Sequence, residues 1–85
     1  QAPAVDYLLA EETELPELSE DMKPADALAL AMKKEQQAVE FYRRLADNSL
    51  DPELRDLCLH MADMELNHKF KLENAYTDVA YIEAF

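Results

Sequence analysis

Two long stretches of strong helix-forming residues, separated by a short break, most constrain how this chain can fold. The first, residues 24–47, opens with Pro24 and is rich in Ala, Leu, Met, Lys, Glu and Gln. Residues 47–49 (Asp-Asn-Ser) favour caps and turns, and Asp51-Pro52 then predicts the start of a second helix that runs to about Tyr76. Because the connection is short, the two helices should lie antiparallel as a hairpin. The predicted fold class is therefore all-α.

Charge divides the chain into three parts. Residues 1–22 carry seven acids and no base, whereas residues 23–76 contain all eight bases and ten acids. We interpret 1–22 as an acidic linker or docking segment, 23–76 as the helical hairpin, and 77–85 as an apolar C-terminal tail. The net charge of −11 argues against nucleic acid or an anionic membrane as a partner.

Several classes of site are excluded by composition. The chain has no glycine, which removes phosphate-binding loops and dinucleotide fingerprints. Its one cysteine, Cys58, cannot form an internal disulfide or a two-cysteine knuckle for zinc or iron. No apolar run approaches the ~18 residues of a membrane span, and no charged N-terminal region leads into an apolar stretch. We therefore expect a cytoplasmic location.

Three ionisable residues occupy positions where helical periodicity predicts an apolar core. Glu35 interrupts the apolar stripe of the first helix, and Glu65 and His68 interrupt that of the second. Burying an unpaired carboxylate costs several kcal/mol, so these groups need compensation. The predicted stripes are Leu28, Ala31, Ala38, Tyr42 and Leu45 in the first helix, and Leu54, Leu57 or Cys58, Met61, Leu72 and Ala75 in the second.

A shared metal ion would provide that compensation. Glu65 and His68 are three residues apart and lie on one helix face, about one turn from each other. Oxygen donors with one nitrogen per metal suit iron, or manganese as the second choice. Di-metal carboxylate bundles take a Glu from each of two helices and a Glu-x-x-His from each of the others, so one hairpin provides half of the set. Two copies related by a two-fold axis would complete it with four carboxylates and two imidazoles.

Three segments resemble the rubrerythrin branch of the ferritin-like superfamily over residues 25–76. They are residues 31–46 (AMKKEQQAVEFYRRLA), 51–55 (DPELR) and 61–69 (MADMELNHK), matching a pattern of Glu, Phe-Tyr-x-x-Leu-Ala and Leu-Ala-x-x-Glu-x-x-His. The resemblance implies that Glu35, Glu65 and His68 are iron ligands and that Tyr42 stands beside them. It also implies a ferritin-like four-helix bundle, with a di-iron centre that oxidises Fe(II) with O2 or reduces hydrogen peroxide. Such a protein would be an oxidoreductase, either a ferroxidase or a peroxidase.

The chain departs from this pattern because it has one hairpin where a typical member has two, and it lacks the rubredoxin-type cysteine pairs. We expect the missing hairpin to come from a second copy, giving a homodimer or a multiple of dimers, or from the other half of a longer chain. Glu65 would then bridge the metals, Glu35 would bind terminally or chelate, and His68 would supply one nitrogen per metal. The alternative is a non-enzymatic helical oligomerisation module, in which the Glu/His trio is a buried polar network that fixes register.

Overall fold

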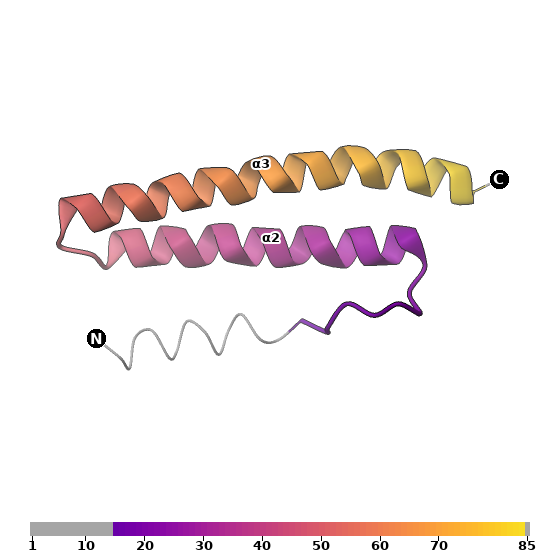
Figure 1. Ribbon diagram of the computed structural model, residues 1–85, viewed down its shortest axis with the longest axis horizontal. Helices are drawn as coiled ribbons and strands as arrows, with labels where there is room; N and C mark the ends of the chain where they lie inside the picture. The colour runs from indigo at the N-terminus through magenta and orange to yellow at the C-terminus, as the bar shows by residue number, and fades with distance from the viewer. Residues whose placement is uncertain (1–14, 85) are drawn as a thin grey trace.

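A computed structural model describes residues 15–84, which form two antiparallel helices, α2 (Pro24–Asp47) and α3 (Pro52–Glu83) (Figure 1). The predicted all-α class and the helical hairpin are confirmed. Pairing with a second hairpin stays a prediction. Most of the acidic segment 1–22 lies outside the described residues, and residues 15–23 lead into α2 without regular structure.

The start of each helix follows from its first residues. Asp51 is the N-cap of α3, and its Oδ1 accepts a hydrogen bond of 3.0 Å from the backbone N–H of Glu53. Lys23 precedes Pro24 at the start of α2 and has no capping side chain. The carboxylate of Glu83 supplies that function, because its Oε2 accepts a 3.3 Å hydrogen bond from the N–H of Ala25. The last turn of α3 is therefore joined to the first turn of α2.

The predicted end of the second helix near Tyr76 is wrong, because α3 continues to Glu83. Residues 77–83 contain no glycine or proline that would stop a helix. The bond from Glu83 to α2 also gives the extra turns a contact that their own sequence does not reveal. The segment predicted as a separate apolar tail is thus helical through Glu83.

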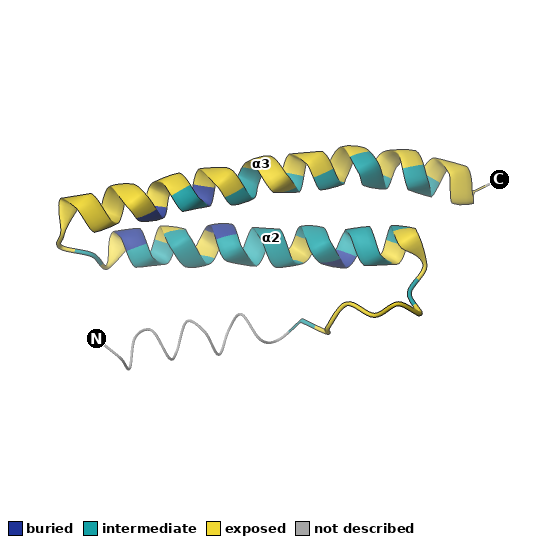
Figure 2. Cartoon of the chain, viewed as in Figure 1, coloured by how far each residue is buried: buried dark blue, intermediate teal, exposed yellow. Residues whose placement is uncertain are grey.

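Small side chains are buried where the two helices pack together. Val39 and Ala46 of α2 and Cys58 and Ala62 of α3 are at most 6% exposed, and the buried parts of α3 lie on its side toward α2 (Figure 2). Alanine and cysteine allow the helix backbones to approach closely, so the hairpin closes through them. Of the alternatives Leu57 and Cys58, the buried residue is Cys58.

The predicted apolar stripes lie beside this contact and not at its centre. Leu28, Ala31, Ala38, Tyr42 and Leu45 are half-buried on α2. On α3, Leu54 and Leu57 are exposed, and Met61, Leu72 and Ala75 are half-buried. Two helices bury only one side of each other, so the hairpin leaves these stripes partly open, as expected of a chain that needs a second hairpin. No helix within residues 15–84 is long and apolar enough to cross a membrane.

The cap at the start of α3 gives a direct test of this fold. Replacing Asp51 by Ala leaves the Glu53 N–H without its acceptor, so we expect a loss of about 1 kcal/mol in the free energy of unfolding. Urea denaturation followed by circular dichroism measures it. Asp63→Ala is the matched control, because Asp63 is an exposed mid-helix acid. Equal stability of the two variants would contradict the capping role.

Candidate metal centre

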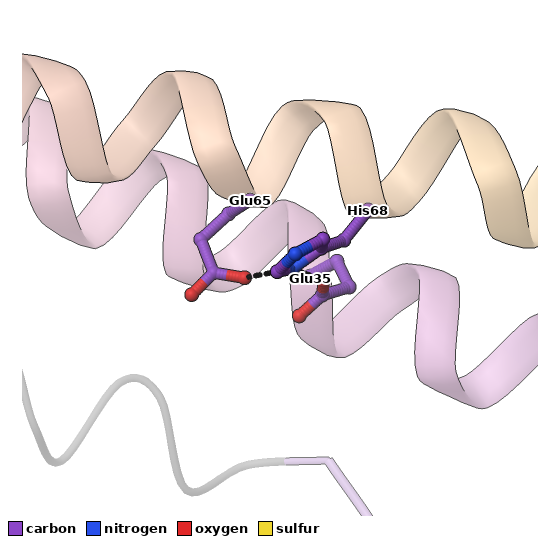
Figure 3. Close-up of polar contacts among 3 residues, drawn as sticks. All are labelled: Glu35, Glu65 and His68. Atoms are coloured by element: carbon purple, nitrogen blue, oxygen red, sulfur yellow. Dashed lines mark hydrogen bonds and ion pairs between the residues drawn. The ribbon is translucent and has the colours of Figure 1, made fainter.

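The three ionisable residues singled out in the sequence come together across the two helices (Figure 3). Nδ1 of His68 lies 3.2 Å from Oε1 of Glu65 on the same helix and 3.2 Å from Oε2 of Glu35 on α2. One ligand atom from each residue falls within 4.8 Å of the other two. A single nitrogen therefore faces two carboxylates that belong to different helices.

Helix geometry explains this convergence. Glu35 has eleven α2 residues before it and twelve after it, and His68 has sixteen α3 residues before it and fifteen after it. In an antiparallel hairpin with a short connection, residues at similar distances from the connection lie near each other, and Glu35 is 12 residues from the end of α2 while His68 is 16 residues from the start of α3. The three-residue spacing of Glu65 and His68 then brings both side chains to the same side of α3.

The site is only partly shielded from solvent. The side chains of Glu35 and Glu65 are 23% and 20% exposed, and that of His68 is 52% exposed. Burial raises the pKa of the Glu35 carboxyl above its ordinary value, and a hydrogen bond with Glu65 and the charge of Glu65 raise it further. His68 acts in the opposite direction through its charge and its hydrogen bond. The carboxylates thus hold more negative charge than one imidazole balances.

Comparison with known proteins assigns the chain to a protein family. The family model described as Rubrerythrin matches residues 26–84, which include both helices and all three clustered residues. This chain belongs to the rubrerythrin family. No curated protein and no solved structure matches it.

The residues of this rubrerythrin-family chain fit a divalent metal. Two carboxylate oxygens and an imidazole nitrogen are a donor set that iron and manganese accept. The pKa of Glu35 is raised, so its ionised form is disfavoured in the folded chain. A bound cation would stabilise that ionised form, because positive charge near two carboxylates favours their ionisation. The three donors come from one hairpin, so they provide part of a coordination shell and leave the rest to other groups.

Tyr42 does not join this cluster. It is half-buried on α2, where its ring contacts Phe41 edge-to-face with centroids 5.5 Å apart. Within the described part of the chain it forms no hydrogen bond to Glu35, Glu65 or His68. Its place beside the metal ligands therefore stays a prediction from the family resemblance.

A polar contact next to the clustered residues was not predicted from the sequence. Nζ of Lys69 donates a 2.9 Å hydrogen bond to Oε1 of Gln36, which joins the two helices. Lys69 and Gln36 directly follow His68 and Glu35 in the chain. The prediction that His68 and Glu35 lie close together therefore also indicated that these two following residues are near each other. Lys69 is thereby engaged with an amide and does not neutralise the clustered carboxylates.

The pKa of Glu35 predicts how the metal-free protein responds to pH. A carboxyl whose pKa is raised by folding contributes most to stability below its ordinary pKa, and that contribution falls as the pH rises through the folded value. Glu35→Gln should therefore be more stable than the parent chain at pH 7, with a difference that disappears below about pH 4. Urea unfolding in chelator across this pH range measures the difference.

Asp63→Asn makes the same change of charge at an exposed site on α3 and serves as the control. A Glu35→Gln variant whose stability relative to the parent does not change with pH would contradict the raised pKa of Glu35.

Proposed function

We propose that this chain is a ferritin-like di-metal carboxylate protein that uses iron, with manganese as the alternative metal. The observation that supports this most directly is the convergence of Glu35, Glu65 and His68 from two helices onto one point. Membership of the rubrerythrin family supports the same chemistry, since the matched region contains all three residues.

The proposed site needs a second hairpin. With a second set of the same residues, the centre would have four carboxylates and two imidazoles, which is the full ligand set of a di-metal bundle. In this arrangement Glu35 and Glu65 would hold the two metals through carboxylate oxygens, Glu65 being the carboxylate shared by both, and His68 would provide one nitrogen for each metal. The second hairpin would be another copy of the chain or the other half of a longer one.

The proposed activity is the oxidation of Fe(II) with O2 or the reduction of hydrogen peroxide, as a ferroxidase or a peroxidase. When bound, a pair of iron ions supplies two electrons together, which avoids the release of a one-electron radical product. The residues of the chain provide the ligands, and the half-buried position of Glu35 and Glu65 limits the access of water to them. Binding requires Glu35 and Glu65 to be ionised and Nδ1 of His68 to be free of its proton, so metal uptake releases protons.

A non-enzymatic role is the second candidate, and one observation favours it. The 3.2 Å contacts from His68 to both carboxylates join the three side chains directly into one polar network. Such a network inside a helical bundle fixes the register of the helices, as single polar core residues do in coiled coils. In that case the chain would be an oligomerisation module whose properties do not depend on metal.

Matched substitutions on α3 separate the two candidates. We expect His68→Ala and Glu65→Ala to weaken the binding of Fe(II) and Mn(II) at least ~10-fold, because each removes a donor from a small set. Elemental analysis after anaerobic loading and desalting gives the bound metal, and circular dichroism checks that helicity is kept.

His60→Ala and Glu73→Ala are the controls, since both residues are exposed and lie on the same helix outside the cluster. The controls should bind as the parent chain does. Unchanged metal content in His68→Ala and Glu65→Ala would overturn the metal site and favour the polar network.

A further inference from the structure

A second polar contact joins the two helices directly beside the clustered residues. Nζ of Lys69 donates a 2.9 Å hydrogen bond to Oε1 of Gln36. Lys69 follows His68 in α3, and Gln36 follows Glu35 in α2. Each helix therefore contributes two consecutive residues to two neighbouring contacts, and we name the Lys69–Gln36 pair the brace.

The Gln36 amide is held on both sides. While its Oε1 accepts from Lys69, its Nε2 donates a 2.9 Å hydrogen bond to Oε2 of Glu40, one turn further along α2. Because the oxygen and the nitrogen have different partners, the amide has one favoured orientation. Lys69 is half-buried, and within residues 15–84 it bonds to this amide and to no carboxylate. Its place between the helices therefore has a geometric use and does not come from ion pairing.

The brace stands where the close packing of the hairpin ends. The buried side chains between the brace and the connection of the two helices are Val39, Ala46, Cys58 and Ala62. On the other side of the brace, toward the ends of the chain, Leu30 alone is buried among the described residues. Small apolar side chains thus hold the helices together on one side of the brace only.

An open groove of about 400 Å³ begins at the brace on the loosely packed side. Lys69 and Gln36 line it, together with Met32 and Tyr76. Within the described residues, the next polar contact between the helices is the 3.3 Å bond of Glu83 to the N–H of Ala25. Lys69 and Glu83 are 14 residues apart, or about 21 Å along α3. The brace is therefore the first contact that holds the helices together beyond the close packing.

This position bears on the clustered ligands. Glu65 and His68 belong to one helix, and Glu35 comes from the other (Figure 3). Helix geometry fixes the first two relative to each other, but the 3.2 Å approach of Glu35 to His68 depends on how the two helices are placed at this level. Metal sites need their ligands within about 0.5 Å of the productive position. We propose that Lys69 and Gln36 are positioning residues, which hold Glu35 at binding distance from His68 and Glu65.

The charge of Lys69 makes the proposal testable by the sign of an effect. A positive charge beside a site for a cation repels that cation, so its removal alone would strengthen metal binding. Loss of a positioning contact would weaken binding instead. Gln36 is neutral, and its substitution changes the contact without changing the net charge. Weaker binding in variants of both residues is therefore a result that the charge alone does not give.

Mn(II) binding to the full chain, followed by the electron paramagnetic resonance signal of free Mn(II), measures the effect. We expect Lys69→Met and Gln36→Met each to weaken binding about 5-fold, the size of effect that the loss of one hydrogen bond produces. The double variant should be no weaker than either single variant, because both remove the same bond. Lys69→Arg keeps a donor on a long side chain and should recover most of the affinity.

Lys71→Met is the matched control, since Lys71 is an exposed lysine on the same helix and its substitution removes the same charge. It should bind Mn(II) at least as tightly as the parent chain. Circular dichroism checks that all variants keep their helicity.

A second readout needs no metal. In chelator, the nuclear Overhauser effect between the ring protons of His68 and the methylene protons of Glu35 reports their distance across the helices. It should weaken in Lys69→Met and Gln36→Met, and it should persist in Lys71→Met. A contact that only added stability would leave this signal unchanged in a variant that stays folded.

The inference rests on the proposed function for the effect on metal, and the metal-free signal is scored separately. Weaker Mn(II) binding and a weaker signal in both variants of the brace would support it. Binding as tight as that of the parent in Gln36→Met, or an unchanged signal in both variants, would overturn it. If the parent chain itself takes up no Mn(II), the proposed function fails and the metal-free signal alone decides whether the brace positions Glu35.

Discussion

The contact of two carboxylates with one imidazole nitrogen across the two helices is the constraint on which the proposed function of this hairpin depends most. Glu35 and Glu65 each approach Nδ1 of His68 to 3.2 Å, and the pKa of Glu35 is raised by burial and by its acidic neighbour. A chain optimised only for stability would place apolar residues at these three positions. Their presence at the centre of both helices is explained if a cation belongs there.

The rest of the hairpin is arranged around that centre. Small buried residues close the helices against each other, and Glu83 joins the end of α3 to the start of α2. This packing leaves one side of each helix open, and the cluster of Glu35, Glu65 and His68 lies beside that open side. The same surface that exposes apolar residues to solvent therefore also carries this cluster. One event, the docking of a second hairpin, would satisfy both.

Local signals in the sequence predicted the starts of both helices and the three residues that cluster between them. Pro24, Asp51 and Pro52 mark helix starts because their conformational preferences act at short range. The cluster was predictable because three ionisable residues broke an otherwise apolar periodicity. The end of α3 was predicted too early, although residues 77–83 contain no glycine or proline, and the contact of Glu83 with α2 joins residues 58 positions apart and has no local signal. The partner that covers the apolar stripes was not predictable, because periodicity shows which residues share a face and not which partner covers that face.

Native mass spectrometry of the chain, after anaerobic loading with Fe(II) and desalting, would measure the metal content and the oligomeric state together. We expect a dimer, or a multiple of dimers, that carries two iron ions for each pair of chains. An oligomer that retains no iron after loading would contradict it and would identify the Glu35, Glu65 and His68 cluster as a structural network.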